Sequence, residues 1–157
     1  MKVLLINIGK TEEAYLSEGQ KVYEKRLQHY CNFETVYLTP PPAIQKLPAN
    51  RLKTKESELI QKHLKPGDYL ILLDEKGRQF RSVEMASWLG KFQVSGIRRI
   101  VFITGGAFGF HESLYQLANE KLSLSSLTFP HQLVRLIFLE QLYRAFTILR
   151  NEPYHNE

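Results

Sequence analysis

Short apolar runs separated by longer amphipathic stretches predict a chain in which strands alternate with helices. The runs at 3–8, 33–38, 69–73 and 99–104 are each followed within two residues by glycine, proline or a charged residue, which is typical of buried strands. A shorter strand is expected at 122–125. This alternation favours an α/β fold, with a mostly parallel sheet that carries helices on both faces.

Amphipathic or apolar segments between the runs predict the helices. They are expected at 12–30, 50–64, 82–95, about 111–120 and about 130–149. Thr11 is expected to cap the first of these helices and Ser82 the third. Segment 39–50 is the only linker-like stretch and is too short to separate domains, so residues 1–157 are expected to form a single domain.

The final helix is apolar around most of its circumference. Its apolar residues are Leu133, Val134, Leu136, Ile137, Phe138, Leu139, Leu142, Ala145, Phe146, Ile148 and Leu149. A helix that is apolar all round is buried on all sides. In a chain of 157 residues this suggests a subunit interface in addition to the core, so a homodimer is expected.

Positive charge is concentrated in the middle of the chain. Of the net +5, all is accounted for by residues 51–100, which hold eleven Lys or Arg and six Asp or Glu. Such an excess is typical of a protein that binds a polyanion such as nucleic acid, and equally of a solvated helix face. The candidate phosphate contacts are helix 50–65, Arg78, Arg81, Arg98 and Arg99.

Cysteine content and hydropathy exclude two classes of protein. The single cysteine, Cys31, excludes an internal disulfide framework and a cysteine-based zinc cluster, and it fits a reducing compartment. No stretch approaches the roughly 18 consecutive apolar residues of a membrane helix. The apolar run at 3–8 is too short for a signal-peptide core. A cytoplasmic protein without a membrane partner is expected.

A glycine-rich turn, Thr104-Gly-Gly-Ala-Phe-Gly-Phe-His111, follows one predicted strand and opens a helix. Glycines permit a tight turn and let a ligand approach main-chain amides. The spacing differs from the dinucleotide-binding fingerprint, and no Gly-Lys-Ser/Thr phosphate loop follows. A ligand-binding turn and a plain strand–helix turn both remain possible here.

Polar residues follow the strand at 69–73. Asp74 and Glu75 stand where open α/β sheets bind ligands, or else form an Asx-type turn. Successive strand residues point to opposite faces, which excludes a paired-carboxylate glycosidase. Ser125, His131 and Asp74 would make a hydrolase triad, but no G-x-S-x-G motif surrounds Ser125.

Several motifs together resemble one protein family. They are Leu73-Asp74, Gly105-Gly106, the Leu-Ser-Leu-Ser run at 122–125, Thr128-x-Pro130-His131, Arg135, Glu140-x-Leu142-Tyr143-Arg144-Ala145 and Pro153-Tyr154-His155. In this order and spacing they resemble the ribosomal RNA large subunit methyltransferase H family of the SPOUT superfamily, which methylates N3 of a pseudouridine in bacterial 23S rRNA. The resemblance covers essentially the whole chain.

The resemblance implies a C-terminal trefoil knot, a homodimer, and S-adenosyl-L-methionine held in a bent conformation by three backbone loops. No metal is implied, because the sulfonium is already an activated methyl donor. By position, the contacts to this cofactor are Leu73, Gly105, Leu124, Ser125, Ser126, Leu127, Thr128 and Phe129.

The resemblance also indicates which residues act on the RNA. His131, His155 or a group of the RNA would take the N3 proton, and Tyr154 and His155 would stack on or hydrogen-bond the target base. Arg135 and Arg144 would orient the tail or the RNA, or else pair with Glu140.

The tail departs from the family at one position, and other functions remain open. Asn156 stands where the family commonly has a basic residue. The leading hypothesis is an enzyme that acts on the bacterial ribosome. The alternatives are a SPOUT methyltransferase for another RNA such as tRNA, a non-catalytic ribosome-binding or RNA-binding knot protein and, more distantly, a small-molecule hydrolase.

Overall fold

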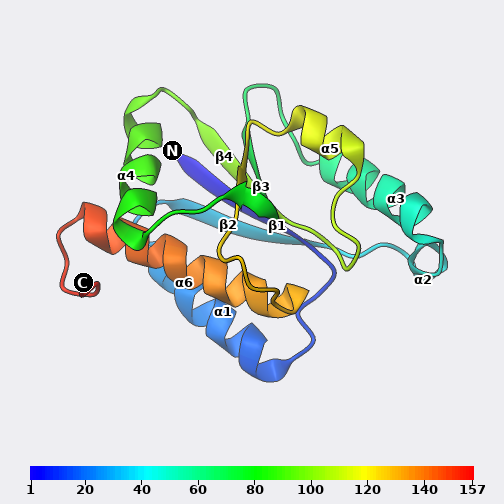
Figure 1. Cartoon of the computed structure of the whole chain (residues 1–157), viewed down its shortest axis with the longest axis horizontal. Coiled ribbons are helices and arrows are strands. Elements are labelled where there is room, and N and C mark those ends of the chain that lie inside the picture. The colour runs from blue at the N-terminus through cyan, green and yellow to red at the C-terminus, as the bar shows by residue number, and fades with distance from the viewer.

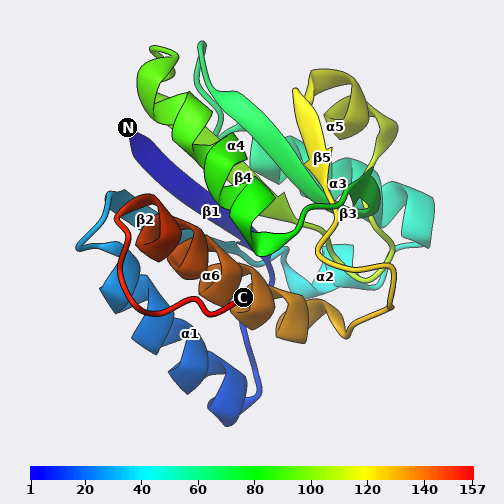
Figure 2. The same ribbon diagram turned by 60° about the vertical axis from the view of Figure 1, so that its left-hand side comes forward.

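Five parallel strands form a sheet in the order β2-β1-β4-β3-β5 in the computed structural model, which describes all 157 residues (Figure 1). The strands are β1 (Lys2–Ile8), β2 (Asn32–Leu38), β3 (Tyr69–Arg78), β4 (Arg99–Thr104) and β5 (Glu120–Leu122). Helices cover both faces of this sheet (Figures 1 and 2). The predicted α/β class, with a mostly parallel sheet between two helical layers, is confirmed.

The helices divide between the two faces. They are α1 (Ala14–Leu27), α2 (Pro42–Gln45), α3 (Ala49–Gln61), α4 (Ser82–Val94), α5 (Glu112–Leu117) and α6 (His131–Leu149). α1, α4 and α6 cover one face, with α6 packed against both α1 and α4, and α2, α3 and α5 lie on the other side. None of these helices combines the length and the apolar composition of a membrane-spanning segment.

Alternate residues of each inner strand enter two separate cores. In β1, Val3 and Leu5 pack toward α1, α4 and α6, whereas Leu4 and Ile6 pack toward α3 and α5. Because both faces are covered, these strands appear in the sequence as continuous apolar runs rather than alternating ones.

The two strands at one edge differ from their predicted ranges. β3 continues to Arg78 instead of ending at Leu73, and β5 lies at 120–122 instead of 122–125. Leu122 pairs with both Leu73 and Arg78, so the pairing of β3 with β5 contains an irregularity. The charged segment after Leu73 is therefore held by tertiary strand pairing, which local sequence does not reveal.

Two predicted helix caps are wrong. Thr11 does not cap α1: its hydroxyl donates to Gln20 (3.1 Å) and accepts from Arg135 (3.1 Å). Ser82 is the first residue of α4 rather than its cap, and the Glu84 carboxylate accepts from the backbone N–H before it. The short helix α2, in the stretch predicted to be a linker, was missed because it begins at one of three consecutive prolines.

The apolar circumference of α6 is largely used within the chain. Seven of its residues are buried by the sheet, α1 and α4, and most of its other apolar residues are half-buried. Its composition alone therefore does not require a second subunit. The trefoil knot stays a prediction of the family resemblance.

Candidate functional site

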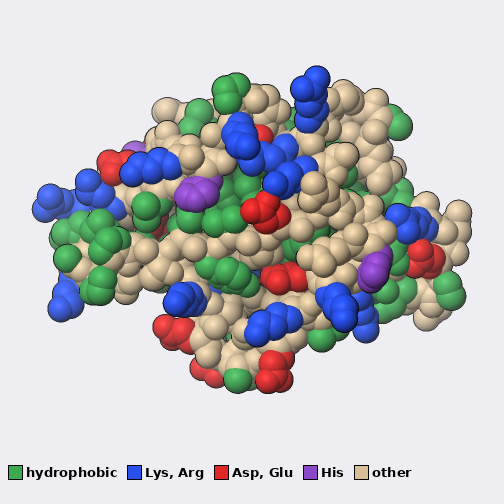
Figure 3. Space-filling view, turned by 180° about the vertical axis from the view of Figure 1, so that it is seen from behind, with side chains coloured by type: hydrophobic (Ala, Val, Ile, Leu, Met, Phe, Trp, Pro, Cys, Tyr) green, Lys and Arg blue, Asp and Glu red, His purple; other side chains and the backbone are tan.

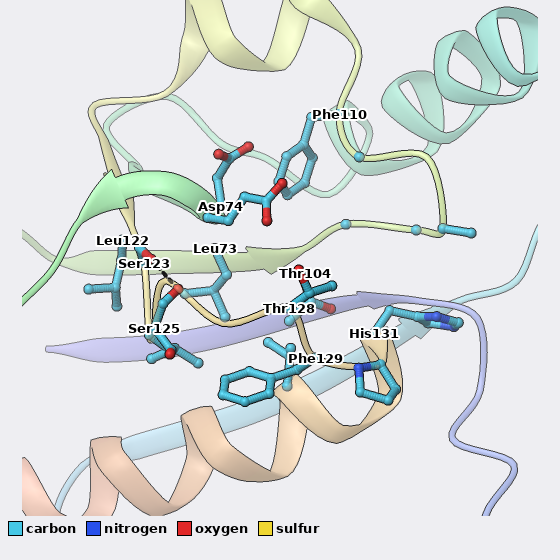
Figure 4. Close-up of a pocket in the computed structure, with 18 of the residues that line it drawn as sticks. Leu73, Asp74, Thr104, Phe110, Leu122, Ser123, Ser125, Thr128, Phe129 and His131 are labelled. Atoms are coloured by element: carbon cyan, nitrogen blue, oxygen red, sulfur yellow. Dashed lines mark hydrogen bonds between the residues drawn. The ribbon is translucent and has the colours of Figure 1, made fainter.

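A cavity of about 430 Å³ opens at the carboxyl ends of β3 and β4 (Figure 4). The loop from β5 into α6 forms its opposite wall. Its volume lies within the roughly 300–1,000 Å³ typical of small-molecule sites. Open α/β sheets bind ligands at this edge, so the cavity is the candidate functional site.

Seven of the eight residues predicted to hold the cofactor line this cavity. They are Leu73, Gly105, Leu124, Ser125, Leu127, Thr128 and Phe129. Ser126 is the exception, since it is exposed and outside the lining. The cofactor contacts themselves stay a prediction, but three segments far apart in the sequence do meet there.

Hydroxyl groups hold the loop after β5 in shape. Ser123 donates to the carbonyl oxygen of Ser125 (2.9 Å) and accepts from the Gln79 amide (3.3 Å). The Ser125 hydroxyl accepts from the backbone N–H of Leu127 (3.0 Å). These serines therefore order the backbone of the wall.

The hydrolase triad considered from the sequence is not assembled. Ser125, His131 and Asp74 all line the cavity, but no hydrogen bond joins them. Instead, Asp74 accepts from the backbone N–H of Lys76 (2.8 Å), as in an Asx turn, and from the Tyr115 hydroxyl (2.5 Å). Burial, together with this bond, raises the pKa of Tyr115.

Glycines let the backbone itself form the wall after β4. A side chain at Gly105 would place its Cβ 3.3 Å from the Phe110 ring, and one at Gly106 would place it 2.7 Å from the Glu56 carboxylate. The wall thus offers peptide groups beside apolar side chains. That is the chemistry an adenosyl group requires, with main-chain partners for the base edge and an apolar slot for its faces. The residues present therefore fit S-adenosylmethionine.

Tyr154 and His155 belong to the tail that follows α6, and they contact this helix outside the cavity. The Tyr154 hydroxyl donates to Glu140 (3.0 Å), and its ring meets the Tyr143 ring edge-on at 4.7 Å. The guanidinium of Arg144 lies 4.8 Å from the centre of the Tyr154 ring. Burial, and then bonding to neighbouring hydroxyl and carboxylate groups, raises the pKa of Tyr154.

Arg144 links His155 to the helix. It forms an ion pair with Glu140 (2.5 Å) and donates to Nδ1 of His155 (3.2 Å). Because arginine only donates, Nδ1 is the acceptor and the ring proton is on Nε2, which is buried without a partner. In this arrangement His155 has no free lone pair. Of the three predicted catalytic residues, only His131 lines the cavity.

A second hollow of about 320 Å³ adjoins the cavity on the side of the tail. It shares Leu122, Ser123, Leu124 and Phe129 with the cavity. The chain turns back after α6 and runs alongside it (Figure 2). Glu157, at the end of the tail, lies 3.7 Å from Arg81 on the rim of this hollow, in an exposed and therefore weak pair. The tail thus approaches the cavity without entering it.

Comparison with known proteins settles the family. Residues 1–155 match the family described as predicted SPOUT methyltransferases. The chain belongs to the SPOUT methyltransferase family. It is 50% identical, over the full length of both chains, to the ribosomal RNA large subunit methyltransferase H of Parabacteroides distasonis. Proteins of the same name from Christiangramia forsetii (46%, 99% of each chain) and Phocaeicola vulgatus (45%, all of each chain) are also similar. The resemblance deduced from the motifs is confirmed.

Arg135 has a different place in this SPOUT methyltransferase from the one predicted. It is fully buried and donates to the carbonyl oxygens of Ile8 (2.5 Å) and Gly9 (3.0 Å). It therefore ties the end of β1 to α6, and the predicted contacts with the tail, the RNA or Glu140 are wrong. No sequence pattern identifies a buried arginine that donates hydrogen bonds to backbone carbonyl oxygens.

The predicted phosphate contacts separate into two groups. Arg99 is largely buried and paired with Asp68 (Nε to Oδ1, 2.7 Å), so it is not a free phosphate contact. Arg78, Arg81 and Arg98 are exposed. On the face shown in Figure 3, Lys and Arg side chains are spread among acidic ones rather than gathered in one patch.

Glu56 is a buried residue beside the cavity that the sequence analysis missed. Its carboxylate packs against Gly106, and burial raises the pKa of Glu56 to about 7. A signal was present in the sequence. Glu56 follows Leu52 and precedes Ile60 at four-residue spacings, so it falls on the apolar stripe of α3.

Proposed function

We propose that this SPOUT methyltransferase transfers a methyl group from S-adenosylmethionine to N3 of a pseudouridine in the 23S rRNA of the bacterial ribosome. One observation of the structure carries the proposal: three backbone segments enclose a cavity of suitable size where the family resemblance expects the methyl donor. Full-length relatives at 42–50% identity, which bear the name of an rRNA methyltransferase, support it.

The protein's part in the reaction is chiefly to position the reactants. The sulfonium supplies an activated methyl group when the donor is bound. Leu73, Gly105 and the segment 124–129 hold the donor, and the apolar wall keeps water from it. Holding two reactants in a near-attack geometry supplies much of the rate in such a transfer.

The N3 proton of the acceptor must leave as the methyl group arrives. His131 lines the cavity and is exposed, so it is the protein group best placed to take that proton. His155 can do so only after its Nδ1 separates from Arg144. Tyr154 and His155 contact the target base once it is unstacked, and a group of the RNA is the remaining proton acceptor.

Exposed basic residues and the assembly of two subunits are the features by which the protein recognises the ribosome. The exposed Arg78, Arg81 and Arg98, with the basic helix α3, contact phosphates.

The protein acts in the cytoplasm as a homodimer of single-domain subunits. The half-buried apolar residues of α6 outside the cavity, such as Leu133 and Ile137, support that assembly. Light scattering after size-exclusion chromatography tests it, and a mass of one chain would contradict it.

The deciding experiment is transfer of labelled methyl groups from S-adenosylmethionine to purified bacterial ribosomes, with and without the target pseudouridine. Incorporation only when the pseudouridine is present is expected. Gly105→Val is the matched inactive control, because it alters the cavity and leaves every predicted RNA contact unchanged.

Other outcomes identify the alternatives. Incorporation into tRNA but not ribosomes would point to a different RNA target. Tight donor binding without transfer to any RNA would indicate a binding role, with Asn156 the first residue to replace by a basic one.

A further inference from the structure

Glu56 is a buried carboxyl group without a partner in the protein. Only 7% of the residue is exposed, and its carboxylate forms no hydrogen bond or ion pair. The adjacent Ser57 bonds Ser113 of α5 (2.6 Å), so the helix is held to its neighbour by other contacts. A largely buried acid without a partner in the protein is costly to the fold, and a function is the natural reason to retain one.

The carboxylate lies directly behind the wall of the cavity. Its two oxygens are 2.7 and 3.0 Å from the position that a Cβ on Gly106 would take, and Gly106 itself lines the cavity. The thickness of one backbone segment therefore separates Glu56 from a ligand. The other nearby acids differ from it, since both oxygens of Asp74 are engaged and Glu75 is exposed.

We propose that Glu56 is a positioning residue that makes the cavity favour a cationic methyl donor over the neutral product left after transfer. The inference rests on the proposed function, because the donor carries a sulfonium and S-adenosylhomocysteine a neutral sulfide. A fixed carboxylate one backbone segment away attracts the sulfonium through space and gains nothing from the sulfide. Glu56 thereby raises the affinity for the donor before transfer, and this contribution to binding is lost once the neutral product has formed.

α3 and the elements next to it carry several charged or titratable residues. They are Lys53, Lys55 and Glu58 on α3 itself, Lys46 after α2, His111 and Glu112 at α5, and Asp74 and Glu75 of β3 in the cavity lining. Lys55 pairs with Glu58 (3.4 Å). Burial alone raises the pKa of Glu56 to about 7, so none of these groups supplies a compensating charge.

The sign of the pH dependence follows from this. Below about pH 7 the free protein carries a neutral Glu56, and a bound cation favours the ionised form. Donor binding near neutral pH should therefore release a proton, and donor affinity should rise from pH 6 to pH 8. Product binding should do neither on account of Glu56.

Calorimetric titration with S-adenosylmethionine and with S-adenosylhomocysteine, in buffers of different ionisation enthalpy between pH 6 and pH 8, tests the inference. Wild type, Glu56→Gln and the exposed control Glu58→Gln are compared. We expect Glu56→Gln to lose about tenfold of the preference for donor over product at pH 8, together with the proton released on donor binding. Glu58→Gln should behave as wild type, and titration of the ligand's own amino group is common to all three proteins.

An unchanged preference and unchanged proton release in Glu56→Gln would overturn the inference while leaving the proposed function intact. If wild type bound neither ligand, the proposed function would fail with it. Glu56→Asp keeps the charge and should retain part of the pH-dependent preference. That variant provides the test if Glu56→Gln does not fold, and a pH-independent preference in it would count against the role.

Discussion

The cavity and the C-terminal tail lie on neighbouring parts of the molecule, but backbone forms most of the first and side-chain contacts hold the second. The cavity wall consists largely of backbone and loop residues, and the hydroxyls of Ser123 and Ser125 hold the loop after β5 in shape. The tail is held by side chains, with Glu140, Arg144 and Tyr154 joined in one network. A ligand would therefore meet mainly peptide groups in the first region, with Asp74, Glu75 and His131 as its ionisable side chains, and a linked network of ionisable side chains in the second.

This difference indicates which changes each region tolerates. A wall made of backbone loses little when a side chain is shortened, but it is blocked when one is added. A network of charged and aromatic side chains fails when one member is removed, because its partners are left half-buried and unpaired. Binding of the donor and turnover should therefore be separable by mutation.

Gly105→Val should have the largest effect on donor binding. Its Cβ would lie 3.3 Å from the Phe110 ring, and its methyl groups would occupy the cavity. Donor affinity should fall by about 100-fold, with the fold retained, as measured by calorimetry and circular dichroism. Gly105→Ala, which adds one methyl group, should lose much less. Full activity in the valine variant would show that this cavity does not hold the donor.

His155→Ala should lower turnover by about 100-fold and leave donor affinity within about twofold, since the residue lies outside the cavity. Single-turnover kinetics with ribosomes and donor titration measure the two quantities separately. Asn156→Ala changes the exposed neighbour and is the control. If donor binding were lost instead, the tail would belong to the cavity and the separation drawn here would be wrong.

Arg144→Lys should have an intermediate effect. Lysine keeps the charge but cannot hold Glu140 and His155 together with planar N–H groups. We expect turnover to fall by about tenfold and the free energy of unfolding by about 1–2 kcal/mol, from denaturant titration. Arg150→Lys, at the exposed end of the same helix, should change neither. Equal losses in both variants would indicate a general effect of the helix end.

Tyr23→Phe should have the smallest effect. The hydroxyls of Tyr23 and Tyr154 are 3.5 Å apart, at the limit of a hydrogen bond, so turnover should change by less than about twofold. Tyr154→Phe removes the 3.0 Å bond to Glu140 and should cost about fivefold. A larger loss of turnover in Tyr23→Phe than in Tyr154→Phe, measured with ribosomes, would show that the functional contact of Tyr154 is with Tyr23 of α1 rather than with Glu140 of α6.

Local sequence predicted the inner strands and the last helix well. β4 matches its predicted range and α6 begins one residue later than predicted, because long apolar runs have few alternatives to burial. The paired strands β3 and β5 were predicted less well. β5 was placed two residues late and β3 ended five residues early, since their pairing with each other decides where both strands end.

The candidate site was predicted in part for the same reason. The consecutive residues after β5 were named together, and most of them line the cavity. Glu56 was missed, and Arg135 was assigned to the wrong contacts. Both are polar residues on helix faces whose neighbours in the structure, Gly106 and the end of β1, are far away in the sequence.

The sequence by itself determined the α/β class, the order of the main elements and the family, because these depend on apolar periodicity and on motifs of fixed spacing. Tertiary structure alone decided which charges are free. It paired Arg99 with Asp68, buried Arg135 against carbonyl oxygens and left Glu56 unpaired behind the cavity. The physical reason is that the behaviour of a charge depends on its distance to other charges and to water, and folding sets both distances.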